Sequence, residues 1–283
     1  MPPVNQFLAE NSTDWSLAAS WVDNVGVAST VPVSTDNTRI MIGRQTIANG
    51  LSNAAVDLTT LMIGDKFMGN LGSNGTSLEI AVFQTSTGVF TYQAGGGVAY
   101  VKAGTAGIHK CLVQGRGKLF LTGGVFSILE VSRGSCDCND QTNLNAKVVR
   151  IFGGDTTIAF RSGDAPTQVD VYGGVVRLYR PPTTLNIYDG SVILYVDRSA
   201  NSAATLNQTG GSCRLLGGNV PIWNIYNGTF DASDASRPIT LGGTTTIIGA
   251  NANILVNPLV TLPTTGITLL GRRTGITGSP ATQ

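Results

Sequence analysis

The sequence predicts an all-β fold of the β-solenoid type, a parallel β-helix with an N-terminal cap and a C-terminal tail. Glycine-containing dipeptides recur through residues 123–243 at a mean spacing of about 20 residues, which is typical of solenoids. The segments between them alternate apolar and polar residues, as strands do. No apolar pattern of helical period persists over three turns. Together these observations predict stacked coils built from short strands.

The repeat is marked by dipeptides that suit tight corners. Seven of them can be aligned: Gly123-Gly124, Gly153-Gly154, Gly173-Gly174, Asp189-Gly190, Gly210-Gly211, Asn227-Gly228 and Gly242-Gly243. Gly, Asn and Asp tolerate a positive φ angle, which a tight corner commonly needs. The uneven intervals predict loops of different length, the longest at residues 134–145. The spacing also allows some dipeptides to mark different corners of one larger coil, and Gly95-Gly96-Gly97 is a further candidate corner.

Alignment on the second residue of each dipeptide arranges the flanking positions in columns. Three mostly aliphatic columns should face the interior, because side chains alternate along a strand. They run from Leu119 to Pro238, from Leu121 to Thr240 and from Ile128 to Ile247. Two columns should face outward: an Asp/Asn column with Asp170, Asn186, Asn207 and Asn224, and an aromatic column with Phe152, Tyr172, Tyr188 and Tyr226. Like side chains one coil apart can share amide hydrogen bonds and ring contacts.

We expect three segments along the chain: a cap at residues 1–45, the solenoid at 46–250, and an edge strand with a tail at 251–283. The cap contains Trp15 and Trp21, a short helix near residues 16–21 and a strand at 38–42. It would cover the open end of the first coil. Strands are expected at 78–83, 89–93 and 98–103. Pro258 and Pro263 suit an edge strand, and residues 271–283 are expected to form a tail.

Composition excludes several classes of function. Hydrophobic residues make up 42% of the 283 residues, enough for a core, whereas charged residues make up only 12% and the net charge is +1. Without a Lys/Arg run, we expect no binding to nucleic acid. No apolar run is long enough to span a membrane, and the first residues lack the pattern of a secretory signal.

Carboxylates are the first candidates for catalysis. The best outward cluster is Asp170, Asp189 and Asp155, with Arg150 and Arg177 nearby. However, Asp189 and Asp155 lie at turns, where Asp is favoured for backbone reasons, and Asp170 belongs to the Asp/Asn column. The single histidine removes most proton-transfer schemes. We therefore predict no catalytic residues, no enzymatic activity and no cofactor.

The four cysteines and the histidine raise the question of a metal site. His109 and Cys111 are two residues apart, as are Cys136 and Cys138, and one coil could bring the two pairs together. These are ligand types that zinc prefers, although the spacing is not a standard zinc pattern. We expect no metal, and four incidental residues with largely buried thiols.

The aromatic column is the main candidate for an interface. We expect one exposed stripe and the two tryptophans of the cap to make subunit or partner contacts: Phe152, Tyr172, Tyr188, Tyr226, Tyr179, Tyr195, Trp15 and Trp21. Large exposed apolar patches usually mark interfaces. The alternative is that the stripe packs beneath loops of the same chain.

The Ser/Thr/Asn/Gly-rich composition, the glycine corners and the opening with Trp15, Trp21 and VPVSTDNTRI resemble β-helical virion proteins of tailed bacteriophages. The capsid decoration (cement) type is the most similar, and autotransporter-passenger-type surface proteins are similar more weakly. The resemblance implies a homotrimer that binds the major capsid protein or other virion proteins, in a virion assembled in the host cytoplasm. We therefore expect a structural protein that binds and stabilises the capsid lattice. The alternative is a tail spike or fibre that binds or cleaves host surface polysaccharide.

Overall fold

The computed structural model confirms an all-β chain in which parallel strands stack as the coils of a β-solenoid. It describes residues 5–278 except 9, 11, 24, 29, 34–35, 84–87, 104–107, 141–144, 161–164, 196–202 and 271–274. The chain divides into two compact units. The N-terminal unit comprises residues 1–146 with 160–164, and the C-terminal unit comprises 147–159 with 165–283. This division differs from the expected boundaries near residues 45 and 250.

The N-terminal unit consists of short strands and one helical turn. They are β1 (Asn5–Leu8), η1 (Ala18–Ser20), β2 (Trp21–Val22), β3 (Asn37–Gly43), β4 (Thr46–Ile47), β5 (Ser52–Leu58), β6 (Thr60–Phe67), β7 (Asn70–Leu71), β8 (Leu78–Phe83), β9 (Val89–Tyr92), β10 (Val98–Ala103), β11 (Ile108–Val113), β12 (Lys118–Leu121), β13 (Val125–Val131) and β14 (Ser135–Asp140). The strands expected at 78–83, 89–93 and 98–103 correspond to β8, β9 and β10.

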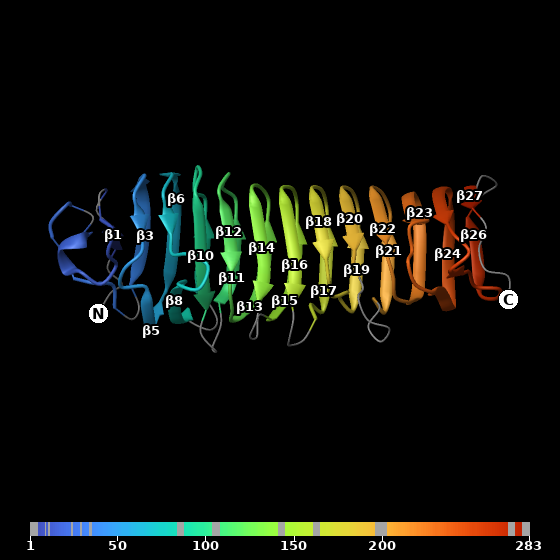
Figure 1. The fold of residues 1–283 in the computed structure, drawn as a ribbon, viewed down its shortest axis with the longest axis horizontal. Coiled ribbons are helices and arrows are strands. Elements are labelled where there is room, and N and C mark those ends of the chain that lie inside the picture. Colours follow the sequence, from blue (N-terminus) through green and yellow to red (C-terminus); the bar gives the residue numbers. More distant parts are fainter. Residues whose placement is uncertain are drawn as a thin grey trace. The chain divides into compact units, whose positions relative to one another are not determined.

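In the N-terminal unit the strands from β3 onward pair in parallel with strands of the next coil. One series runs β3, β6, β9, β11 and β13, and another runs β10, β12 and β14. These strands lie side by side as successive rungs (Figure 1). Because β3 already belongs to the first series, the stack begins by Asn37 and not after residue 45.

The cap is held together by its two indoles. Trp15 and Trp21 pack edge to face with ring centroids 4.7 Å apart, and the indole Nε1–H of Trp21 donates a hydrogen bond to the Trp15 carbonyl at 2.8 Å. Both side chains are fully buried. Strand β1 pairs antiparallel with β2 and in parallel with β3, which joins the cap to the first coil. The expected helix near residues 16–21 is the single 3₁₀ turn η1.

The C-terminal unit has two strand segments per coil. Its strands are β15 (Asn145–Ile151), β16 (Asp155–Phe160), β17 (Gln168–Val171), β18 (Val175–Leu178), β19 (Thr184–Ile187), β20 (Ser191–Leu194), β21 (Thr205–Gln208), β22 (Ser212–Leu215), β23 (Val220–Ala232), β24 (Ile239–Val256), β25 (Val260–Thr261), β26 (Ile267–Leu270) and β27 (Gly275–Gly278). The odd-numbered series β15 to β21 continues into the first half of β23, and the even-numbered series β16 to β22 into its second half.

The end of the chain continues this stack. Strands β26 and β27 pair in parallel with the two halves of β24, and β25 pairs with its beginning. Residues 275–278, expected in a tail, therefore form a strand, whereas the rest of that expected tail lies outside the described residues. The Pro-flanked edge strand expected after residue 251 corresponds to β25, between Pro258 and Pro263.

The interior is filled by the predicted aliphatic columns. Val169, Leu185, Leu206 and Trp223 stand in register on successive coils and are fully buried. Burial of one such aliphatic side chain stabilises the fold by about 1.5–3 kcal/mol. Gln208 occupies one interior position, where its Nε2 donates hydrogen bonds to the carbonyls of Gly211 at 3.1 Å and Thr229 at 3.0 Å. Both donors of this buried side chain are therefore paired, whereas its Oε1 has no hydrogen-bond partner among the described residues.

The glycine corners have a steric cause. Gly174 has φ +83°, and a Cβ placed on it would lie 2.6 Å from the carbonyl oxygen of Gly154 on the preceding coil. Gly190 repeats the arrangement with φ +87° and a 2.7 Å approach to the carbonyl oxygen of Gly174. Only glycine meets both demands at low cost. The same carbonyls accept hydrogen bonds from the next coil, as in Val175 N–H to Gly154 at 2.9 Å.

Two of the seven aligned dipeptides do not belong to this column. Gly123-Gly124 lies between β12 and β13, at a different corner from Gly134, the positive-φ glycine between β13 and β14. Because this corner was misassigned, the prediction that Ile128 faces inward was also wrong. Ile128 is only partly buried, whereas Phe126 and Leu129 are fully buried. The spacing therefore did combine two corners of one coil.

Gly242-Gly243 is likewise out of register. Ala252 stands opposite Gly228, and the expected inward residues Pro238 and Thr240 are exposed. Gly95-Gly96-Gly97, in contrast, is a corner of the expected type between β9 and β10, with Gly97 at φ +73°.

Candidate interaction surface

The C-terminal unit presents a stack of aromatic rings at its glycine corner, which we call the aromatic ladder: Phe152, Tyr172 and Tyr188. Each ring follows the last residue of β15, β17 or β19. Phe152 and Tyr172 have ring centroids 4.8 Å apart at an interplanar angle of 6°, and Tyr172 and Tyr188 are 4.6 Å apart at 4°. The in-register backbone sets this spacing, because neighbouring strands lie about 4.8 Å apart.

The ladder is exposed to solvent. Phe152, Tyr172 and Tyr188 expose 49%, 41% and 44% of their surface, so the described residues of the chain do not cover them. Their faces contact one another, and therefore mainly ring edges and two hydroxyl groups point outward. Burial within the stack, followed by the neighbouring Tyr172 and Asp170, raises the pKa of the Tyr188 hydroxyl. The surface is thus apolar with neutral hydrogen-bonding groups.

The expected aromatic stripe divides into separate groups. Thr209 occupies the position between Tyr188 and Tyr226, so Tyr226 is exposed in the same column without joining the ring stack. Tyr179 and Tyr195 stack on each other at 4.7 Å, but they follow β18 and β20. The corner Gly173-Gly174 and the whole of β18 lie between Tyr172 and Tyr179, and the four residues of that strand span about 13 Å. One stripe containing all six rings was therefore a wrong prediction.

The tryptophans of the cap are also misplaced as interface residues. Trp15 and Trp21 were expected at a subunit contact as well as in the cap. Their side chains are 1% and 0% exposed. A ring that packs completely within its own chain has no surface left for a partner, so the expected subunit contact of these two rings was a wrong prediction.

Beside the aromatic ladder lies the Asp/Asn ladder. Asn186 Nδ2 donates to Asp170 Oδ1 at 2.8 Å, and Asn207 Nδ2 donates to Asn186 Oδ1 at 2.9 Å. Asn224 Nδ2 continues the series to Asn207 Oδ1 at 2.9 Å. Each amide therefore pairs across a coil boundary, as the sequence predicts. The ladder is less exposed than expected, since Asp170 and Asn224 are buried.

The carboxylates considered for catalysis all have structural partners. Asp170 is 4% exposed and accepts two hydrogen bonds from Gln168 Nε2, at 2.9 and 2.8 Å, besides the one from Asn186. Asp155 pairs with Arg177 across one coil, and Asp189 accepts a hydrogen bond from the Gly190 N–H at 2.7 Å. Arg150 stands in register with Asp170. These bonds account for the three carboxylates as parts of coils and turns.

Three of the four residues in the candidate metal set meet inside the N-terminal unit. Cys111, Cys136 and Cys138 are buried, and the two sulfur atoms of Cys136 and Cys138 are 3.9 Å apart. The described residues contain no group of three or more His, Cys, Asp or Glu side chains that could hold a metal ion. Burial, followed by the charge of Cys136, raises the pKa of the Cys111 thiol.

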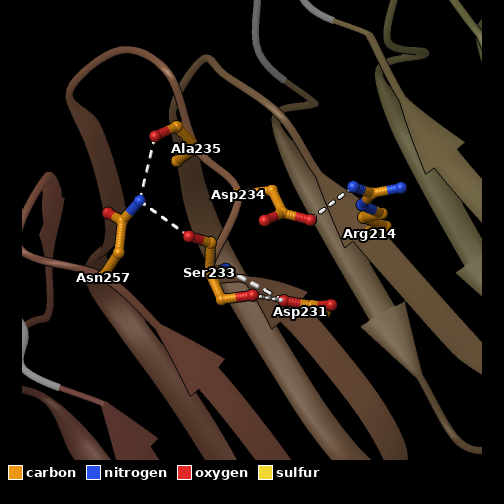
Figure 2. A network of polar contacts seen from close by, with 6 residues as sticks. All are labelled: Arg214, Asp231, Ser233, Asp234, Ala235 and Asn257. Carbon is orange, nitrogen blue, oxygen red and sulfur yellow. Dashed lines mark hydrogen bonds and ion pairs between the residues drawn. The ribbon is translucent and has the colours of Figure 1, made fainter.

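A polar network at the end of the C-terminal unit also has a structural role. Asn257 Nδ2 donates to the carbonyls of Ser233 and Ala235, at 2.9 Å each, and thereby joins the turn after β23 to the residue that follows β24 (Figure 2). Asp231 accepts bonds from the N–H and hydroxyl of Ser233, and Arg214 pairs with Asp234. All of these contacts fix one turn.

The N-terminal unit carries a surface feature that the sequence did not predict. A groove of about 550 Å³ lies along its corners and is lined by Asp65, Met68, Gln93, Gly95, Gln114, Gly115, Arg116 and Arg133. We call it the N-terminal groove. A signal exists in the short segments QAGGG, QGRG and SRG, which place Gln or Arg beside a corner glycine. The sequence indicated only the first of these corners, at Gly95-Gly96-Gly97, because the other two lack a glycine dipeptide.

Comparisons with known proteins provide no relative. No family model, no curated protein and no solved structure matches the chain. Among the described residues, no helix has the length and apolar character needed to cross a membrane.

Proposed function

We propose that the chain is a structural, non-enzymatic protein of a bacteriophage virion that binds and stabilises the capsid lattice through the aromatic ladder. The observation that carries the proposal is the exposed stack of Phe152, Tyr172 and Tyr188 on three successive coils. Exposed aromatic surface is costly in water and is enriched at protein interfaces. The virion setting follows from the sequence resemblance.

The surface chemistry favours a protein partner over a polysaccharide. Sugars stack on open ring faces, whereas in the ladder the ring faces contact each other at interplanar angles of 4–6°. The best candidate base, Asp170, is buried and bonded to Gln168 and Asn186. A tail spike that cleaves polysaccharide would need an accessible carboxylate in that position, whereas one that only binds it would need open ring faces. We therefore place the contact with protein, at the ring edges and hydroxyl groups.

The experiment measures binding of the purified chain to capsids that lack it. Tyr172→Ser with Tyr188→Ser removes two ladder rings and should abolish co-sedimentation and the gain in heat or osmotic resistance. Tyr179→Ser with Tyr195→Ser removes the same chemistry from the other corner and should retain both. Circular dichroism confirms that each variant is folded. Binding that survives loss of the ladder, or capsids whose resistance does not change, would contradict the proposal.

We further propose that the chain acts as a homotrimer, because solenoids often associate side by side around a closed symmetry axis. Light scattering at increasing concentration should give three times the mass of 29.4 kDa. A monomer throughout the concentration range would contradict this part of the proposal and leave the capsid contact to be tested separately.

A further inference from the structure

The N-terminal groove combines positive charge with unsatisfied amide groups. Arg116 and Arg133 belong to neighbouring coils, after β11 and β13, and both are exposed. Neither guanidinium forms an ion pair or hydrogen bond with the part of the chain that the structure describes. Among the described residues that line the groove, Asp65 is the single carboxylate against two arginines, which gives an excess of positive charge. From this arrangement we propose that the groove binds an acidic peptide segment in extended conformation.

The two arginines select the acidic side chains. A guanidinium pairs with a carboxylate through two parallel hydrogen bonds, which gives both strength and orientation. Side chains two residues apart in an extended peptide point to the same side, about 6.6 Å from each other. Two long arginine side chains on coils about 4.8 Å apart can reach both carboxylates. An Asp/Glu-x-Asp/Glu pattern therefore fits the groove.

The two glutamines supply recognition of the peptide backbone. Gln93 Nε2 donates to Gln114 Oε1 at 3.0 Å, as in the Asn ladder of the C-terminal unit. This pairing leaves the Gln93 Oε1 acceptor and the Gln114 Nε2 donor available, with no further partner among the described residues. One backbone N–H and one backbone C=O satisfy such a pair. An extended peptide offers both groups, whereas a simple anion offers only acceptors.

The remaining lining residues favour a peptide over an acidic sugar as the ligand. None of the eight lining residues is aromatic, so a sugar ring finds no face to stack on. Met68 is 47% exposed, and its thioether can pack against apolar side chains of varied shape. Because the groove and the aromatic ladder belong to different units, the proposal does not rest on the function proposed above.

Fluorescence anisotropy with the full chain tests the proposal. The probe is a labelled peptide in which glutamate alternates with threonine, and the matched probe replaces each glutamate by glutamine. We expect saturable binding of the acidic peptide, weakened by salt, and at least about tenfold weaker binding of the neutral one. Oligogalacturonate and inorganic phosphate should not compete at equal carboxylate or phosphate concentration. Equal competition by either, or equal binding of the neutral peptide, would overturn the proposal.

Substitutions in the lining test whether the acidic peptide binds in the N-terminal groove. Arg116→Gln with Arg133→Gln should weaken binding about tenfold or more, whereas Lys147→Gln with Arg214→Gln removes equal charge from the C-terminal unit and should have little effect. Asp65→Asn removes the opposing charge and should strengthen binding about threefold. Damage to the fold cannot produce this increase. An unchanged or weaker affinity for Asp65→Asn would contradict the proposed site, and the ladder variant Tyr172→Ser should bind the peptide normally.

Discussion

The two units use the same corner of the coil for different surface chemistry. In three successive coils of the N-terminal unit the residue after the first strand is Gln93, Gln114 and Ser132, and in three successive coils of the C-terminal unit it is Phe152, Tyr172 and Tyr188, followed by Thr209 in the next coil. The backbone hydrogen bonds are equivalent: Gln114 N–H donates to the Tyr92 carbonyl as Tyr172 N–H does to that of Ile151. The comparison shows that the interior and the corner glycines build the coil, while the residue beside the corner is free to determine the surface.

The largest effect should come from the corner itself. Gly174→Ala places a Cβ 2.6 Å from the Gly154 carbonyl oxygen at φ +83° and should lower the free energy of unfolding by about 3 kcal/mol. Gly243→Ala is the matched control, because its Cβ would meet only the Pro221 carbonyl at 3.6 Å. Urea titration of both variants measures the difference. Equal stability of the two would mean that glycine is not required at the corner.

The next effect concerns the Asp/Asn ladder, which the described part of the N-terminal unit lacks. Asn207→Leu removes the bond to Asn186 and leaves the Asn224 amide without its acceptor. We expect a loss of about 2 kcal/mol, because a buried donor or acceptor without a partner keeps its desolvation cost. Asn251→Leu, at an exposed position, should change stability by less than about 0.5 kcal/mol. A ladder variant as stable as this control would show that the amide bonds contribute nothing measurable.

Buried thiols make both units sensitive to alkaline pH. Burial raises the pKa of Cys213 from 9.0 to about 12. Since the thiol is neutral in the folded protein and ionises more easily when unfolded, its contribution is complete below pH 9.0 and is lost as the pH rises toward 12. The loss amounts to about 1.4 kcal/mol per pH unit in that window. Denaturant titrations between pH 8 and 11 should show a shallower decline for Cys213→Val, and an identical decline would contradict the assignment.

The sequence predicts those parts of the fold that depend on a residue and its immediate neighbours in the chain. Positive φ restricts a corner to Gly, Asn or Asp, and strand alternation restricts the interior, so columns such as Val169, Leu185 and Leu206 are predicted correctly. The same locality explains the errors. Gly123-Gly124 satisfies the local rule at another corner, and the 30 residues from Gly124 to Gly154 contain a further corner marked by the single Gly134.

The candidate sites were less predictable than the fold, because they depend on the corner of the coil beside which each side chain lies. The sequence aligned Tyr172 with Tyr188 correctly, but it could not place Tyr179 at the other end of β18 without knowing the length of that strand. The N-terminal groove combines residues from four corners, from Asp65 to Arg133, whose spacing is irregular. These residues lie side by side because the coils stack in register. That register can be read from the sequence only when the length of every coil is known.

Exchange of the surface residues between units should have a smaller effect. Tyr172→Gln introduces the residue of the N-terminal corner and removes two ring contacts, so we expect a loss of about 1 kcal/mol. Gln114→Ala, in the equivalent position, should cost less than about 0.5 kcal/mol because its amide bond is exposed. Thermal unfolding measures both. If Tyr172→Gln were neutral, the ladder would have no part in stability, and selection for a surface role would be its remaining explanation.

The smallest effect should come from the ion pair at the end of the C-terminal unit. Asp234→Asn breaks the pair with Arg214, whose side chain is 47% exposed against 58% for Asp234, and should cost less than about 0.5 kcal/mol. Asn257→Ala in the same network removes two bonds to the carbonyls of Ser233 and Ala235 and should cost about 1 kcal/mol (Figure 2). Urea titration at low and high salt separates the two, because only the ion pair is screened. A larger loss for Asp234→Asn would mean that charge, and not the amide of Asn257, fixes this turn.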